Sequence, residues 1–291
     1  MPKLITAEFR STLTQIEQLR DSKVLVLAAT NLDLDLLPQL YNELQRSGPV
    51  RQLDLVLQSR GGEVNASRRI AMLLRSYCEE LTILVPYFCQ SAATLLALAA
   101  DQIIAGELAM FSPIDPHLQG SGAGESETAI SSLDICKFKD MAADWFGLSS
   151  GPEQTTLLTT LCEQLFPPTL TAFYRTSTEV QVIGEQLLQW QLPEVAGEVR
   201  AEMVRNLLTG YHSHHYALSG KEMQQLGFKV RRAPQIEALF WQLSLILQQF
   251  VGAGTSQSTD ESWIDAALIS ADRAYLRTLQ TEKMKAVWRE D

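Results

Sequence analysis

The first hundred residues alternate between short apolar runs and amphipathic stretches. Residues 23–30 (KVLVLAAT) are almost continuously apolar, which is typical of a strand buried on both faces. Further strands are predicted at 52–58, 81–87 and 102–105, and helices at 31–46, 65–79 and 92–100. Strands that alternate with helices in this way favour an α/β fold with a parallel sheet and right-handed crossovers.

The second half of the chain is mainly helical in pattern. Long helices are predicted at 132–146, 152–165, 168–188, 194–208 and 236–251, and a short one at 220–226. Residues 251–261 (VGAGTSQSTDE) have the composition of a linker. Apolar positions recur at helical spacing in the last thirty residues, which predicts a C-terminal helix. We therefore expect one domain over 1–250, a linker over 251–261 and a helical extension over 262–291.

Composition and charge narrow the functional class. Apolar residues make up 46% of the chain and charged residues 20%, as in a soluble globular protein. The formal net charge is −10 and basic runs are absent, so nucleic acid is not an expected partner.

The expected location is the cytoplasm. Charged residues follow the initiating methionine at once, unlike a signal peptide, and the apolar runs are shorter than the ~20 residues of a membrane span. The four cysteines show no metal-type spacing and are predicted to be reduced thiols.

Two turns carry the candidate chemistry. Gly61 and Gly62 follow the strand at 52–58, and Ser91 lies among small residues between the strand at 81–87 and the next helix. Acyl transfer needs backbone amides that can approach an oxyanion and a hydroxyl presented at a tight bend. The same positions also suit an ordinary strand-to-helix turn and an N-cap serine.

Four segments resemble one family in their sequence and their order. They are residues 55–62 (LVLQSRGG), 91–101 (SAATLLALAAD), 112–116 (SPIDP) and 219–230 (SGKEMQQLGFKV). Over about residues 20–235 the chain is similar to the serine dehydrogenase proteinase family of the Clp protease/crotonase superfamily, relatives of signal peptide peptidase A. The resemblance implies a Clp protease/crotonase-like stack of ββα units, here with additional C-terminal helices.

The resemblance also implies roles for individual residues. Ser91 stands where the family places its nucleophile, at the positive end of a helix. Gly61 and Gly62 correspond to the oxyanion-hole turn, and their amides would act with that of Ala92. One such donor contributes roughly 3 kcal/mol to transition-state stabilisation.

The general base is open to several interpretations. Clp-type proteases have a histidine soon after the serine and an aspartate much later, whereas this chain has Asp115 near the first place and His214 near the second. His214 would then be the base and Asp115 would orient it. A Ser–Lys dyad, as in signal peptide peptidase A, would use Lys137 or Lys139, provided that the lysine is desolvated. Asp115 could equally form a turn between prolines.

A metal site is not expected from the histidine cluster of residues 211–216 (YHSHHY). His214 and His215 are adjacent, and adjacent side chains on an extended segment point in opposite directions. Surface or interface positions are the alternative for these histidines. We predict neither a metal nor a cofactor.

The sequence predicts a serine peptidase-like acyl hydrolase that acts on a peptide or protein. One alternative is a catalytically silent scaffold of the same fold, and another is a crotonase-type acyl-thioester enzyme. Dehydrogenase chemistry is not expected, because the chain has no GxGxxG fingerprint. The superfamily further implies a homo-oligomer, a trimer, hexamer or larger assembly, in which the helices at 236–251 and 262–291 would make contacts.

Overall fold

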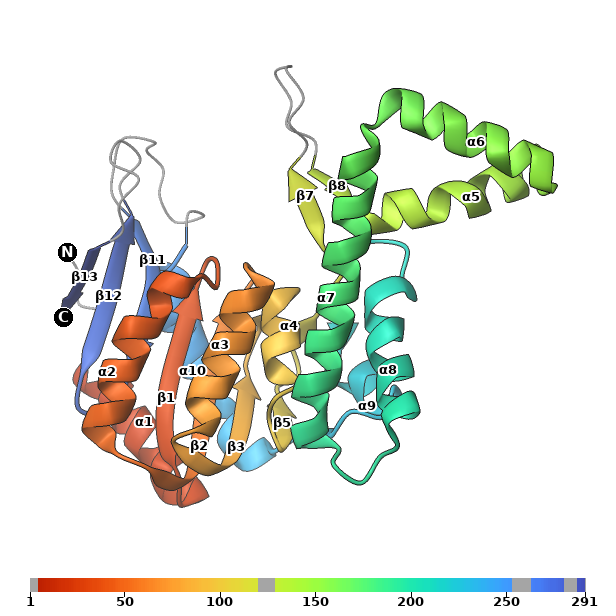
Figure 1. Cartoon of the computed structure of the whole chain (residues 1–291). Coiled ribbons are helices and arrows are strands. Elements are labelled where there is room, and N and C mark those ends of the chain that lie inside the picture. The colour runs from red at the N-terminus through yellow and green to blue at the C-terminus, as the bar shows by residue number, and fades with distance from the viewer. Residues whose placement is uncertain (1–4, 120–128, 253–262, 280–286, 291) are drawn as a thin grey trace.

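The computed structural model describes residues 5–119, 129–252, 263–279 and 287–290 (Figure 1). Its centre is a sheet in which five neighbouring strands run parallel, in the order β10, β5, β3, β2, β1. These strands are β1 (Lys23–Ala29), β2 (Val50–Ser59), β3 (Cys78–Val85), β5 (Gln102–Ala105) and β10 (Val230–Arg231). The prediction of an α/β fold with a parallel sheet is confirmed.

The sheet continues beyond β1 with antiparallel strands, and here the predicted C-terminal helix is wrong. The described residues 263–279 and 287–290 contribute β11 (Trp263–Ile269), β12 (Ala274–Leu279) and β13 (Val287–Glu290). β11 pairs with β1, β12 with β11, and β13 with β12. The physical reason is the open edge of β1, whose backbone groups need partners that a helix could not supply. The predicted linker at 251–261 lies almost entirely outside the described residues.

Helices cover both faces of the sheet and enclose two apolar cores (Figure 1). One face carries the turn η1 (Leu34–Leu36) and the helices α2 (Leu37–Ser47), α3 (Val64–Arg75), α4 (Ala92–Ala97), α7 (Pro167–Gln191), α8 (Gly197–Thr209) and α9 (Gly220–Gln225). The other face carries α1 (Ala7–Arg20) and α10 (Pro234–Phe250). None of the described helices is both long and apolar enough to cross a membrane.

Helix α1 was not identified from the sequence, although its signals are present. Thr6 caps it by accepting a hydrogen bond from the backbone of Phe9. Phe9, Leu13 and Ile16 recur at helical spacing and are fully buried against the sheet.

A helical arm projects from the body of the molecule (Figure 1). It consists of α5 (Ser132–Phe146) and α6 (Gly151–Gln164), and it is preceded by the hairpin of β7 (His117–Gln119) and β8 (Ala129–Ser131). All of α6 is described, and none of its residues is buried. The arm therefore packs little of its own surface within one copy of the chain.

Three short strands continue the sheet past the end of β2 and position the site. They are β4 (Phe88–Cys89), β6 (Met110–Phe111) and β9 (Leu218–Ser219). β4 pairs with both β2 and β6, and β6 pairs with β9. This pairing brings the loop at Ser91, the segment at 112–117 and the histidine cluster of 211–216 to one edge of the sheet.

Candidate active site

A cavity of about 460 Å³ opens at the edge where β2 ends and α4 begins. Its lining includes Gly62, Ser91, Ala92, Asp115, His117 and His214. Residues that the sequence assigned to the nucleophile, the oxyanion hole and the base therefore meet in one cavity, although they come from separate segments of the chain.

Ser91 lies on a strained bend. Its φ of 51° and ψ of −120° are rarely adopted by a residue with a side chain, and only Asp21 shares a positive φ among the described non-glycine residues. The Ser91 N–H donates a hydrogen bond to Ser112 Oγ (2.7 Å), and the Ser112 N–H donates to Thr94 Oγ1 (3.1 Å). Strain of this kind persists where surrounding bonds hold it, often at active sites.

The Ser91 hydroxyl does not cap α4. Ser91 occupies the N-cap position, but its side chain accepts no capping hydrogen bond from that helix. The alternative of a plain N-cap serine therefore loses its structural basis, and Ser91 is instead part of the cavity lining.

Gly61 and Gly62 both need to be glycine. Their φ values are +127° and +136°, and a Cβ on Gly61 would lie 2.7 Å from Ser91 Cβ. A Cβ on Gly62 would collide with the backbone of Leu32. The tight turn thus places backbone directly against the serine.

The amides at this turn are not equivalent. The Gly61 N–H donates to Ser59 Oγ at 3.2 Å. Leu32 makes a hydrogen bond to the residue on each side of Gly62. Its N–H donates to Gly61 O, and its carbonyl oxygen accepts from the Glu63 N–H, both at 2.7 Å. The N–H of Gly62 takes part in neither of these hydrogen bonds. Ala92 is the first residue of α4, where an N–H has no acceptor within the helix. The N–H of Gly61 is thus engaged within the turn, whereas none of these hydrogen bonds uses the N–H of Gly62 or Ala92.

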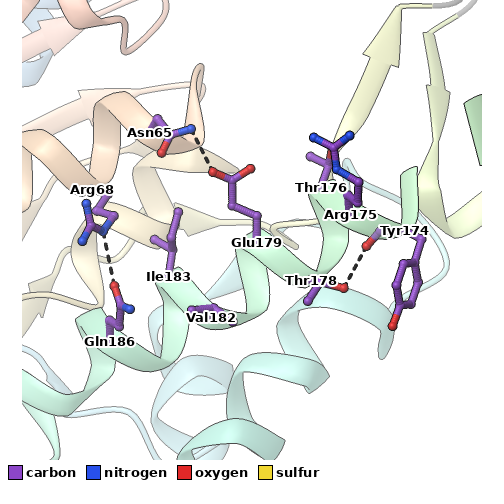
Figure 2. A pocket seen from close by; sticks show the side chains of 10 residues that line it. All are labelled: Asn65, Arg68, Tyr174, Arg175, Thr176, Thr178, Glu179, Val182, Ile183 and Gln186. Carbon is purple, nitrogen blue, oxygen red and sulfur yellow. Dashed lines mark hydrogen bonds between the residues drawn. The ribbon is translucent and has the colours of Figure 1, made fainter. Parts of the chain in front are cut away.

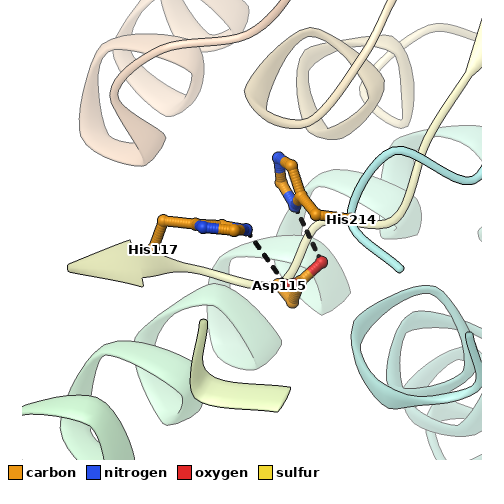
Figure 3. A group of neighbouring side chains, drawn as sticks. All are labelled: Asp115, His117 and His214. Atoms are coloured by element: carbon orange, nitrogen blue, oxygen red, sulfur yellow. Dashed lines mark hydrogen bonds and ion pairs between the residues drawn. The ribbon is translucent and has the colours of Figure 1, made fainter. Parts of the chain in front are cut away.

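Asp115 and His214 form a close pair (Figure 3). His214 Nδ1 lies 2.8 Å from Asp115 Oδ1, and the Ser131 hydroxyl donates to Asp115 Oδ2 at 2.5 Å. The Asp115 side chain is fully buried and that of His214 is 18% exposed. Burial alone would raise the pKa of Asp115, but the hydrogen bonds from His214 and Ser131 outweigh it and lower that pKa. An ionised carboxylate only accepts, so His214 Nδ1 carries the shared proton.

His117 was missed as a site residue by the sequence analysis. Its Nε2 lies 3.4 Å from Asp115 Oδ2, and its ring centroid is 4.1 Å from that of His214. Burial and then the charge of His214 lower the pKa of His117. The signal was its position two residues after Asp115, because side chains at i and i+2 of an extended segment share a face.

The two candidate lysines lie elsewhere. Lys137 is on α5 and pairs with Asp140 at 3.5 Å, with 43% of its side chain exposed, and Lys139 on the same helix is exposed. Neither lysine lines the cavity at Ser91. Within one copy of the chain, therefore, no lysine of α5 meets the desolvation that a Ser–Lys dyad requires.

A second cavity of about 570 Å³ adjoins the first along α3 and α7 (Figure 2). The two cavities share Asn65, Thr176 and Glu179 in their linings. Asn65 donates a hydrogen bond to Glu179 at 3.0 Å, and Arg68 donates to Gln186 at 3.3 Å across the groove between the helices. The cavity at Ser91 thus continues into a second one between α3 and α7.

Three solved structures are distant likenesses of this chain. Two are mutants of the 1510-N membrane-bound stomatin-specific protease. The serine-to-alanine mutant gives a TM-score of 0.42 at 12% identity over 74% of this chain and 79% of that one. The lysine-to-alanine mutant, in complex with a substrate peptide, gives a TM-score of 0.44 at 13% identity over 74% of this chain and 76% of that one. A mutant of ClpP1 from Listeria monocytogenes gives a TM-score of 0.37 at 12% identity over 77% of this chain and 99% of that one.

Two uncharacterized proteins of Methanocaldococcus jannaschii are similar in sequence. One is 28% identical over 181 residues, which cover 62% of this chain and 54% of the relative, and the other is 25% identical over 178 residues, covering 61% and 51%. The chain spans about half the length of these curated relatives.

Residues 42–142 match the family model of the ClpP-like SDH-type serine proteinases. The resemblance drawn from the sequence is thereby confirmed over this segment, which holds Gly61, Gly62, Ser91 and Asp115.

Proposed function

We propose that this protein is a serine peptidase-like acyl hydrolase with Ser91 as its nucleophile. The observation that carries the proposal is the strained Ser91 bend, which shares one cavity with the hydrogen-bonded pair of buried Asp115 and partly exposed His214. Asp115 holds His214 with Nδ1 protonated, which leaves Nε2 as the basic nitrogen.

Each step of the proposed reaction has a residue to perform it. His214 Nε2 takes the proton of the Ser91 hydroxyl while Oγ attacks the acyl carbon. The amides of Gly62 and Ala92 stabilise the oxyanion that forms, at the positive end of α4. His214 then returns the proton to the leaving amine, and water hydrolyses the acyl-enzyme by the same route in reverse.

An extended polypeptide is the proposed substrate. Its support is the second cavity, which shares lining residues with the first and continues along α3 and α7 (Figure 2). Several substrate residues on one side of the scissile bond can lie in a groove of that extent. We propose the cytoplasm as its location, because the four cysteines are free thiols.

The nucleophile is tested with a fluorophosphonate probe, which modifies activated serines. We expect the wild type to be labelled and Ser91→Ala to lose labelling, while Ser149→Ala, at an exposed serine beyond the end of α5, keeps it. If the wild type is not labelled, or Ser91→Ala is labelled equally, the protein is instead a silent scaffold of this fold.

The base is tested by a matched pair of histidine variants. His214→Ala should slow labelling by about 100-fold or more, because the serine loses its proton acceptor. His215→Ala removes an exposed neighbouring ring and should leave the rate unchanged. Equal rates in the two variants would remove His214 from the mechanism.

A further inference from the structure

Three side chains that can bind a metal converge on the wall of the active-site cavity (Figure 3). Asp115, His117 and His214 each offer one ligand atom, and these atoms lie within 4.8 Å of one another. The set differs from the histidine cluster considered in the sequence, since only His214 belongs to both. The tertiary structure adds a carboxylate and a second imidazole from the segment 115–117.

The distances suit a small transition-metal ion. Two ligand atoms bound at about 2.1 Å in tetrahedral geometry lie about 3.4 Å apart. His117 Nε2 and Asp115 Oδ2 are already 3.4 Å apart. His214 Nδ1 lies 2.8 Å from the other oxygen of this carboxylate, Oδ1, so this pair needs to open by about half an ångström and the carboxylate needs to turn for one ion to contact both imidazoles.

The surroundings also fit a metal site. Asp115 is fully buried and receives a hydrogen bond from Ser131, which orients the carboxylate as an outer-shell partner does. The imidazoles lie beside the cavity, which leaves room for water as a fourth ligand.

We propose that Asp115, His117 and His214 form a binding site for a divalent transition-metal ion such as Zn²⁺. Two imidazoles and one carboxylate favour this class over Mg²⁺ or Ca²⁺, which prefer oxygen ligands. His215 is exposed and does not belong to the set whose ligand atoms lie within 4.8 Å of one another.

Metal binding and the proposed catalysis exclude each other. In the Asp115–His214 pair, Nδ1 of His214 carries a proton, whereas as a ligand this nitrogen must offer its lone pair to the ion. The ion therefore removes the arrangement that makes His214 a base, and Zn²⁺ is a reversible inhibitor of the hydrolase. The inhibition rests on the proposed function, while the binding does not.

The site is tested by titrating the full chain with ZnCl₂ in a calorimeter. We expect one Zn²⁺ per chain in the wild type and an affinity at least tenfold weaker in His117→Ala and in His214→Ala. His215→Ala and His212→Ala are the matched controls and should bind as the wild type does. MgCl₂ should give no heat of binding at this site. Equal Zn²⁺ affinity in the wild type and His117→Ala overturns the proposal.

X-ray absorption at the zinc edge identifies the ligands. Nitrogen and oxygen neighbours at about 2.0–2.1 Å support the site, whereas sulfur at about 2.3 Å assigns the ion to a cysteine such as Cys136 and overturns it.

A separate measurement tests the inhibition: Zn²⁺ should slow fluorophosphonate labelling of the wild type at least tenfold, and His117→Ala should lose this response. If Ser91 is never labelled, the proposed function fails, while calorimetry still decides the metal site.

Discussion

Gly61 lies so close to Ser91 that there is no room for a side chain at position 61. A Cβ added to Gly61 would lie 2.7 Å from Ser91 Cβ and 3.2 Å from its Oγ, at a φ that side chains rarely adopt. The turn and Ser91 are therefore one structural unit. Local strain at Ser91 is maintained by this contact and by the hydrogen bond to Ser112.

Gly61→Ala should accordingly damage the site more than the fold. We expect fluorophosphonate labelling to fall by about tenfold or more, because displacement of a nucleophile by an ångström is enough for this loss. The free energy of unfolding should fall by about 1–3 kcal/mol through backbone strain. Gly151→Ala is the control, since a Cβ there meets no atom within 4 Å. Unchanged labelling in Gly61→Ala would show that the Gly61–Gly62 turn does not position Ser91 for reaction.

The cysteines differ sharply in their environment. Burial raises the pKa of Cys78 to about 11, and complete burial raises that of Cys89 further still. Cys136 is exposed. The thiolate is the reactive form, so at pH 8 only about a thousandth of Cys78 is reactive.

Alkylation with iodoacetamide at pH 8 should therefore modify Cys136 first, Cys78 slowly and Cys89 only after unfolding. Mass spectrometry of peptides after timed quenching gives the order. Cys136→Ser should remove the fastest phase and leave the others. Rapid modification of Cys89 in the folded protein would contradict its burial.

Among the secondary-structure elements, β11 and β12 carry an unusual charge cluster. Arg277 is only 3% exposed and contacts Asp265 and Asp33, each at 2.7 Å. Asp265 is on β11, Arg277 on β12, and Asp33 lies just before η1. The cluster therefore ties the C-terminal strands to the first crossover of the parallel sheet.

Arg277→Ala should lower the free energy of unfolding by about 3–5 kcal/mol, because it leaves two carboxylates without their cation in a largely buried place. Arg205→Ala is the control. It breaks a pair with Glu202 in which both side chains are mostly exposed, so its effect should stay below about 1 kcal/mol. Urea denaturation followed by circular dichroism measures both. Similar values would mean that the cluster is hydrated.

At the scale of the whole molecule, the arm of α5 and α6 exposes several large aromatic side chains to solvent. Trp145, Phe146, Phe166 and Tyr174 lie on the arm or next to it, each at least 66% exposed. Large exposed aromatic groups of this kind mark interaction surfaces. We propose a second copy of the chain as the partner, in line with the oligomer predicted from the resemblance.

The double variant Trp145→Ser, Phe146→Ser should then shift the protein to a smaller species in light scattering coupled to size-exclusion chromatography. Leu19→Ser, at an exposed leucine of α1 remote from the arm, should leave the mass unchanged. Circular dichroism checks that both variants remain folded. An unchanged mass in the double variant would exclude this part of the arm from the contact.

Prediction from sequence succeeded where the cause is local. The strands of the parallel sheet are recognisable as apolar runs because both of their faces are buried. The predicted ends of α5 agree with the structure because the capping serine and the closing glycine directly flank the helix in the sequence. It failed for residues 263–279. There the stripe of apolar residues fits a helix, yet hydrogen bonds to β1 outweigh it.

The sequence by itself determined the Gly61–Gly62 turn, the small residues around Ser91 and the order of the crossovers, because each depends on neighbouring residues. Only the tertiary structure decided which groups surround the serine. Asp115 and His214 are 99 positions apart, and the pairing of β6 with β9 brings them together. Lys137 and Lys139 are the candidates for a Ser–Lys dyad, but they lie on α5 of the projecting arm (Figure 1), and neither lines the cavity. Spacing along the chain cannot report distances that strand pairing sets.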